Sequence, residues 1–154
     1  MKFKSPGLSL LSLILLSTFS FHQPVSGDLI INLENIRSSE GMIWLALYDS
    51  KENLFVKDKS ILKGIRVDET GDLTGNLTIT MDKVLFGTYA LAIYHDIDND
   101  GELDQNLLGI PTEPYAFARK PKSKWRAPRY KELTFDFSET NQEITTKLAT
   151  WWEQ

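Results

Sequence analysis

Hydrophobic residues recur at every second position in several short stretches of this chain. Leu77, Ile79 and Met81, for example, alternate with threonines, which is the pattern of a strand with one buried face. The run from Met42 to Tyr48 is instead almost continuously apolar and is bounded by turn residues, which is typical of a buried strand. The pattern predicts strands at residues 28–34, 42–48, 61–67, 76–81, 88–94, 133–137 and 144–149.

These segments predict an all-β fold with no long amphipathic helix and no internal repeat. About seven short strands in one domain are typical of a single β-sandwich with Greek-key connections. Antiparallel order is expected because the connections are too short to carry crossover helices. Residues 61–67 and 76–81 are expected to form a hairpin across the turn residues 69–72.

The first 27 residues differ from the rest of the chain. Lys2 and Lys4 precede an apolar run from Leu8 to Phe21, and the small residues Ser26 and Gly27 follow. The run is too short to cross a bilayer core of about 30 Å, so a cleaved signal peptide is expected and an uncleaved membrane anchor is the alternative. We therefore predict a signal peptide at 1–27 and a mature β-sandwich domain at 28–154. We expect this domain to have no transmembrane segment after cleavage and to be located in the periplasm or outside the cell.

Charge and cysteine content narrow the classes of function. The whole chain has a formal net charge of −4, but residues 1–27 hold two Lys and no acid, so the mature domain has a net charge of −6. An exported acidic protein is not expected to bind nucleic acid. The chain has no Cys, so its stability must come from a packed core, with or without a metal ion, and not from disulfides.

The segment after the strand at 88–94, residues 96–104, is called the acidic loop here. Asp96, Asp98 and Asp100 stand at alternate positions, and Gly101 follows them. Carboxylates with this spacing converge on one cation when the chain curls, and the glycine permits the sharp bend. Oxygen ligands without a thiolate favour Ca²⁺. The predicted ligands are Asp96, Asp98, Asp100, the Glu102 carbonyl, Asp104 and Glu113.

One ligand of the usual calcium loop is missing. The twelfth position, which holds a bidentate Glu in an EF-hand, is Leu107 here. Either Glu113 folds back to complete the shell, or the site is weak, with a dissociation constant of roughly 10⁻⁴ to 10⁻³ M. The alternative is a turn without metal, in which Asp side chains accept hydrogen bonds from nearby amides.

His95 is the only histidine of the predicted mature domain, and it lies next to Asp96. A hydrolase that uses His95 with Asp96 or Glu113 is therefore an alternative function. Alternation places His95 on the face of its strand opposite Tyr94, however, and a lone histidine at a strand end is more often a packing residue. The chain has no Gly-x-Ser-x-Gly motif and no cysteine nucleophile.

Seven Lys and Arg residues crowd residues 119–131, called the basic segment here. One hypothesis is a surface for a glycan, an anionic envelope component or an envelope protein. The alternative is a solvated loop that folds against the acidic loop and offsets its charge. The residues predicted to form the binding surface are Trp125, Arg126, Arg129 and Tyr130.

Two neighbouring stretches together resemble a known family. Residues 87–104 read G-x-Y-A-x-A-x-Y-H-D-x-D-x-D-G-x-L-D, and residues 109–117 read G-I-P-x-E-x-Y-x-F. This pattern resembles the DUF2141 family of small exported bacterial proteins, which is named for having no assigned function. The resemblance implies a transthyretin-like or carboxypeptidase-regulatory-like β-sandwich. Many relatives have Asn where this chain has Asp98 and Asp100, while Glu113 matches the family's Glu.

The leading hypothesis is a non-enzymatic exported module of the cell envelope. Its acidic loop binds Ca²⁺ and stiffens an edge that binds a ligand or a partner protein.

Overall fold

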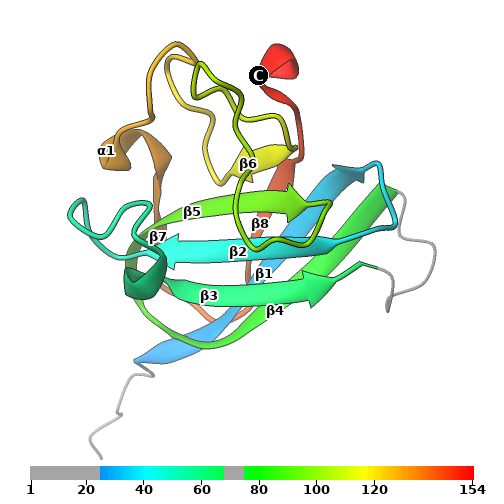
Figure 1. Ribbon diagram of the computed structural model, residues 1–154. Coiled ribbons are helices and arrows are strands. Elements are labelled where there is room, and N and C mark those ends of the chain that lie inside the picture. The colour runs from blue at the N-terminus through cyan, green and yellow to red at the C-terminus, as the bar shows by residue number, and fades with distance from the viewer. Residues whose placement is uncertain (1–24, 68–74) are drawn as a thin grey trace, which may run out of the picture.

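The computed structural model describes residues 25–67 and 75–154, which form two β-sheets packed face to face (Figure 1). The predicted all-β fold with two packed sheets is confirmed. The strands are β1 (Ser26–Ile36), β2 (Met42–Tyr48), β3 (Ile61–Arg66), β4 (Gly75–Leu85), β5 (Gly87–Asp96), β6 (Tyr115–Phe117), β7 (Thr134–Phe137) and β8 (Gln142–Lys147). Among the described residues, short helical segments accompany them: η1 (Lys57–Lys59), α1 (Tyr130–Leu133) and η3 (Trp151–Glu153).

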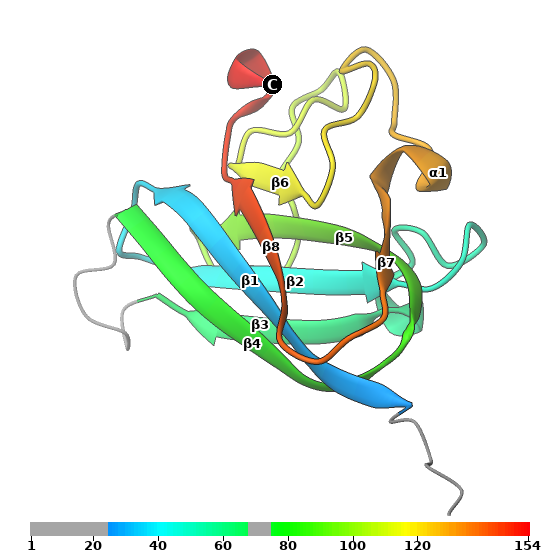
Figure 2. The same cartoon turned by 180° about the vertical axis from the view of Figure 1, so that it is seen from behind.

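The smaller sheet has the order β4-β1-β8, and the larger has the order β3-β2-β5-β6 with β7 also paired to β5. Figure 2 shows the smaller sheet in front of the larger one. Within the described residues every strand pair is antiparallel, as expected, except β1 and β8, which are parallel. These two strands come from opposite ends of the domain, so no single crossover connection has to join them.

The predicted hairpin between residues 61–67 and 76–81 is wrong. β3 pairs with β2 in the larger sheet, whereas β4 pairs with β1 in the smaller one. The chain thus passes from one sheet to the other between β3 and β4, and the turn predicted at 69–72 lies outside the described residues. Alternation along a strand shows which face is buried but not which neighbour the strand pairs with.

The core lies between the two sheets and follows the predicted alternation. Leu29, Ile31 and Leu33 of β1 are completely buried, and they face buried side chains of the larger sheet such as Leu45 and Leu91. Burying each such side chain contributes about 1.5–3 kcal/mol relative to leaving it in water. Of the predicted leader only residues 25–27 are described, and β1 already begins at Ser26.

The outer face of the larger sheet carries a second, smaller apolar cluster. Ala46 of β2 lies opposite Ala92 of β5, and Trp44 lies opposite Tyr94 one step further along the same pair of strands. Asp96 ends β5 on this face. The acidic loop therefore starts at the rim of the outer face, beside its aromatic side chains.

Candidate functional site

Asp96 organises the acidic loop. Its side chain is completely buried, and its Oδ1 accepts hydrogen bonds from the backbone amides of Asn99 (2.7 Å) and Asp100 (3.1 Å). Its Oδ2 accepts hydrogen bonds from the amide of Gly101 (2.9 Å) and from the indole Nε1–H of Trp44 (3.0 Å). A carboxylate has about four lone-pair sites, so the protein itself occupies the accepting capacity of this group.

The backbone of the loop bends where the sequence predicts. Asn99 and Gly101 both have positive φ, 69° and 82°, a region that glycine and asparagine adopt with least strain. The side chain of Asp98 accepts a long hydrogen bond of 3.4 Å from the Asp100 amide, and Asp100 in turn accepts one of 2.8 Å from the Glu102 amide. These are the local bonds that the alternative without metal anticipates, so curling of the loop does not require an ion.

Glu113 closes the loop from outside it. Its carboxylate is 6% exposed and accepts hydrogen bonds from the amides of Ile97 (2.7 Å) and Asp104 (3.2 Å), so that it joins the two ends of the loop. Burial raises the pKa of Glu113; the two amide bonds oppose this shift, and the charges of Asp96 and Asp104 add to it. Each carboxylate oxygen accepts one of these bonds and keeps a further lone pair.

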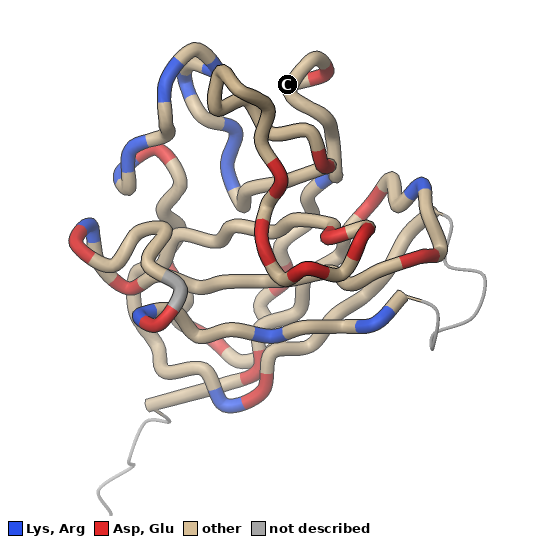
Figure 3. The backbone as a smooth tube through the Cα atoms, in the orientation of Figure 1, with Lys and Arg blue, Asp and Glu red and all other residues tan. Residues whose placement is uncertain are grey.

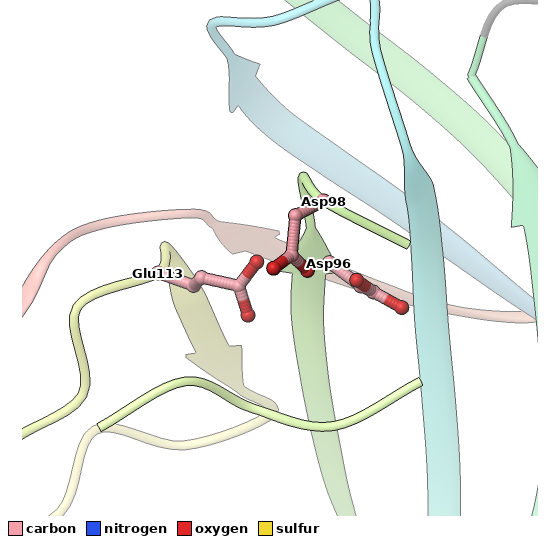
Figure 4. Close-up of side chains that lie close together, drawn as sticks. All are labelled: Asp96, Asp98 and Glu113. Carbon is pink, nitrogen blue, oxygen red and sulfur yellow. The ribbon is translucent and has the colours of Figure 1, made fainter. Parts of the chain in front are cut away.

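Three of the predicted ligands come together. Oxygen atoms of Asp96, Asp98 and Glu113 lie within 4.8 Å of one another, and Figure 4 shows the carboxylates of Asp98 and Glu113 turned toward each other beside Asp96. Desolvation and the neighbouring charge of Asp100 raise the pKa of Asp98. This cluster could hold a metal ion.

The side chains of three other residues of the loop are not part of this cluster, and the predicted role of the Glu102 carbonyl stays a prediction. Asp100, Glu102 and Asp104 are exposed, and their side chains do not belong to the group that converges on Asp98. Asp100 and Asp104 act on the cluster through their charge, since both raise the pKa of Asp98.

Two aromatic residues tie the loop to the sheet, and the sequence patterns did not reveal either role. Trp44 donates to Asp96, and its ring lies so close to Gly64 that a Cβ there would be 2.6 Å from it. The hydroxyl of Tyr94 donates to the Gly101 carbonyl oxygen at 3.0 Å. Burial, with the nearby negative charges of Asp96 and others, raises the pKa of Tyr94 to about 12. Alternation along each strand predicts the face on which each ring lies. The position of the two rings beside the loop depends on the register of β2 against β5.

His95 lies on the inner face of β5, away from the acidic loop. It is 1% exposed, and its Nε2–H donates to the Glu40 carbonyl oxygen at 2.8 Å. Its backbone amide also donates to the Pro114 carbonyl oxygen. His95 is therefore a packing residue whose ring bonds to the backbone. It is not placed to act as the general base that the hydrolase hypothesis requires.

The four predicted surface residues of the basic segment have different surroundings. Arg126 forms a bidentate pair with Glu132 at 2.6 and 3.0 Å, and the Tyr130 hydroxyl donates to the Thr88 carbonyl oxygen. Arg129 is the N-cap residue of α1, whereas Trp125 stands in solvent with 79% exposure. Within residues 25–67 and 75–154 no ion pair joins the basic segment to the acidic loop. Figure 3 shows the two as separate charged stretches of chain.

A groove of about 1120 Å³ lies on the outer face of the larger sheet, and it is called the outer groove here. Ala46 and Ala92 contribute to its lining, together with Glu102 and Leu103 of the acidic loop. The basic segment contributes another part of the lining, including Trp125 and Arg126 but neither Arg129 nor Tyr130. The outer groove thus adjoins both charged segments.

Comparisons with known proteins place the chain in a family and find a distant structural likeness. The family model described as "Uncharacterized protein conserved in bacteria (DUF2141)" matches residues 31–145. No curated protein matches the chain. A fimbrial assembly protein from Parabacteroides distasonis ATCC 8503 has 13% sequence identity and a TM-score of 0.42 over 81% of this chain and 53% of its own. The chain therefore spans about half the length of that structure. Among the described residues no helix is long and apolar enough to cross a membrane.

Proposed function

The chain belongs to the DUF2141 family of bacterial proteins, and we propose that it is an exported, non-enzymatic binding module whose acidic loop is a structural Ca²⁺ site. The observation that carries the proposal is the convergence of the carboxylates of Asp96, Asp98 and Glu113 within 4.8 Å. Like charges held this close repel each other, and a divalent cation would remove that repulsion. The predicted signal peptide supports export.

The three carboxylates differ in how many lone pairs they keep free, and their proposed roles differ accordingly. Asp96 already accepts four hydrogen bonds, so it contributes negative charge and the shape of the loop. Asp98 and Glu113 retain free lone pairs and would be the direct ligands. Two carboxylates completed by water and backbone oxygens suit Ca²⁺, which takes six to eight oxygen ligands in a flexible geometry.

Calcium would stiffen a part of the protein that borders the outer groove. Glu113 joins the two ends of the acidic loop, and Glu102 and Leu103 of that loop line the groove. A cation between Asp98 and Glu113 would cross-link the tip of the loop to its base. The proposed role is therefore to hold one wall of a binding surface in place.

Calcium titration of the mature protein, followed by calorimetry and thermal unfolding, tests this function. With a dissociation constant near ~0.3 mM, calcium at about ten times that concentration would stabilise the fold by about 1.4 kcal/mol. The melting temperature would then rise by roughly 4–8 °C. Mg²⁺ at the same concentration should have a much smaller effect because it demands a tighter octahedral shell.

Matched variants identify the site. Asp98→Asn should abolish the calcium-dependent shift without lowering stability in a chelator, because this exposed side chain makes only one long hydrogen bond in the loop. Glu139→Gln is the control, since Glu139 is exposed and follows β7, which pairs with the opposite end of β5. An Asp98→Asn protein that still responds to calcium, or a wild-type protein that does not, would refute the proposal.

A further inference from the structure

We propose that the outer groove binds an acidic oligosaccharide, with sugar rings against its aromatic side chains and acidic groups on its lysines. This inference goes beyond the calcium site, because it assigns a ligand class to a different part of the surface.

Small side chains line the floor of the outer groove, and larger side chains line its borders. Ala46 and Ala92 lie opposite each other on β2 and β5, and the larger side chains of Tyr48, Tyr94 and Phe117 surround them. Small residues between rings leave a trough on a sheet face that would otherwise be level. The half-buried rings of Tyr94 and Phe117 offer flat apolar surfaces, which match the C–H faces of sugar rings.

Phe55 overhangs this trough from the loop after β2. Its ring is 5.9 Å from that of Tyr48 and 6.3 Å from that of Phe117, yet the residue is 47% exposed. Its φ of 62° is in the left-handed region, which is unusual for a bulky side chain and costs conformational energy. The fold thus holds an apolar ring at the solvent-facing side of the groove.

Trp125 adds a second exposed ring at the basic border. It is 79% exposed, and its ring stands edge-on to Trp151 at 5.0 Å, so that Trp151 supports it from one side. Large aromatic side chains left in solvent beside a groove mark binding surfaces, and tryptophan is enriched among the residues that dominate binding energy.

The lysine side chains that line the outer groove favour an acidic sugar over a neutral one. Lys120, Lys122 and Lys124 line the groove, and no ion pair neutralises them in the part of the chain that the structure describes. Lys124 places its ammonium 4.7 Å from the centre of the Trp151 ring. Arg126 is already neutralised by Glu132, so these three lysines provide the positive potential. A positive border on a protein with a net negative charge attracts anionic ligands.

The position of the groove argues against a peptide ligand. It lies on the face of the sheet, where β2 is paired on both edges by β3 and β5, so its floor has no free strand edge for an added strand.

The test is the binding of defined oligosaccharides to the mature protein in a chelator, where calcium cannot bridge two anions. The probes are tetragalacturonate, a sulfated heparin tetrasaccharide, neutral maltotetraose and a hexaglutamate peptide. We expect at least one acidic oligosaccharide to bind roughly tenfold more tightly than maltotetraose and hexaglutamate, and more weakly as salt rises. Binding by neither acidic sugar, or equal binding of maltotetraose or hexaglutamate, would overturn the inference.

Two pairs of variants locate the ligand. Trp125→Ala should weaken binding by roughly tenfold, whereas Trp152→Ala should leave it unchanged. Trp152 is an equally exposed tryptophan that also packs against Trp151 but does not line the groove. Lys122→Gln should likewise weaken binding, unlike Lys131→Gln, which changes an exposed lysine of the same segment outside the groove. Equal effects within either pair would contradict the assignment.

Discussion

Replacing Asp96 by asparagine tests whether this buried carboxylate holds the acidic loop together independently of metal. Asparagine has nearly the same shape, but one carboxylate oxygen becomes an NH₂ group that donates hydrogen bonds and does not accept them. Each oxygen of Asp96 accepts from two N–H groups. In either orientation of the amide, two partly buried donors therefore lose their acceptor and face another donor.

The magnitude follows from those two donors. A polar group left without a partner costs about 1–3 kcal/mol when it is fully buried, so Asp96→Asn should lower the free energy of unfolding by roughly 2–6 kcal/mol, with the upper figure reached only if water is kept from both donors. This is a large fraction of the roughly 5–15 kcal/mol of a typical domain. With a urea m-value of about 2 kcal/mol/M, the unfolding midpoint would fall by roughly 1–3 M.

The assay is urea unfolding in a chelator, compared with Asp98→Asn. Asp98 makes one long hydrogen bond, and its pKa is raised by desolvation and by neighbouring negative charge, so removing its charge should leave the midpoint unchanged or raise it. Trp44→Phe keeps a ring over Gly64 but removes one of the four donors, and about 1.5–3 kcal/mol should be lost. An Asp96→Asn protein as stable as Asp98→Asn would refute the assignment of Asp96 as the organiser of the loop.

The remaining predictions concern the entry to the loop and its response to pH. Gly41→Ala should cost more than the ~1–2 kcal/mol of a left-handed alanine, because a Cβ at Gly41, where φ is 78°, would be 2.0 Å from the Asp96 carbonyl oxygen. Gly75→Ala is the matched control for urea unfolding: it also has positive φ but nothing within 4 Å, and an equal loss in both variants would contradict the clash. The calcium-dependent rise in melting temperature should shrink as pH falls toward the carboxyl range, because their raised pKa values let Asp98 and Glu113 take up protons at a higher pH than ordinary carboxyl groups do. In a chelator the contribution of Glu113 has the opposite sign: it is most favourable below the ordinary carboxyl pKa of 4.5 and is lost as pH rises through the raised folded-state pKa. A calcium shift of full size at about pH 4.5, measured by thermal unfolding, would count against these carboxylates as ligands.

Much of the local structure could be predicted from the residues in their order. The apolar run at 42–48 became β2 with the same bounds, and the alternation of Leu29, Ile31 and Leu33 gave the buried face of β1. The bend at Gly101 was also predictable, since only a residue tolerant of positive φ fits that position. These features depend on side chains within a few positions of one another, and periodicity describes such relations well.

Partner choice between distant segments could not be predicted in the same way. The sequence pattern suggested a hairpin where β3 and β4 instead lie in different sheets, and it contained no sign that β1 and β8 are parallel neighbours. Several apolar strands are interchangeable by pattern alone, and the packed core selects among them.

The candidate site likewise combines features that follow from nearby residues with features that depend on contacts between distant segments. The order of the residues is enough to show that aspartates crowd a glycine-containing loop and that Glu113 follows close enough to reach it. The fold is needed to show that Asp96 accepts hydrogen bonds from four N–H groups, while Asp98 and Glu113 keep free lone pairs. Residue spacing limits where a carboxylate can lie, but its remaining capacity to bind a ligand depends on which donors the fold brings to it, and Trp44 comes from another strand.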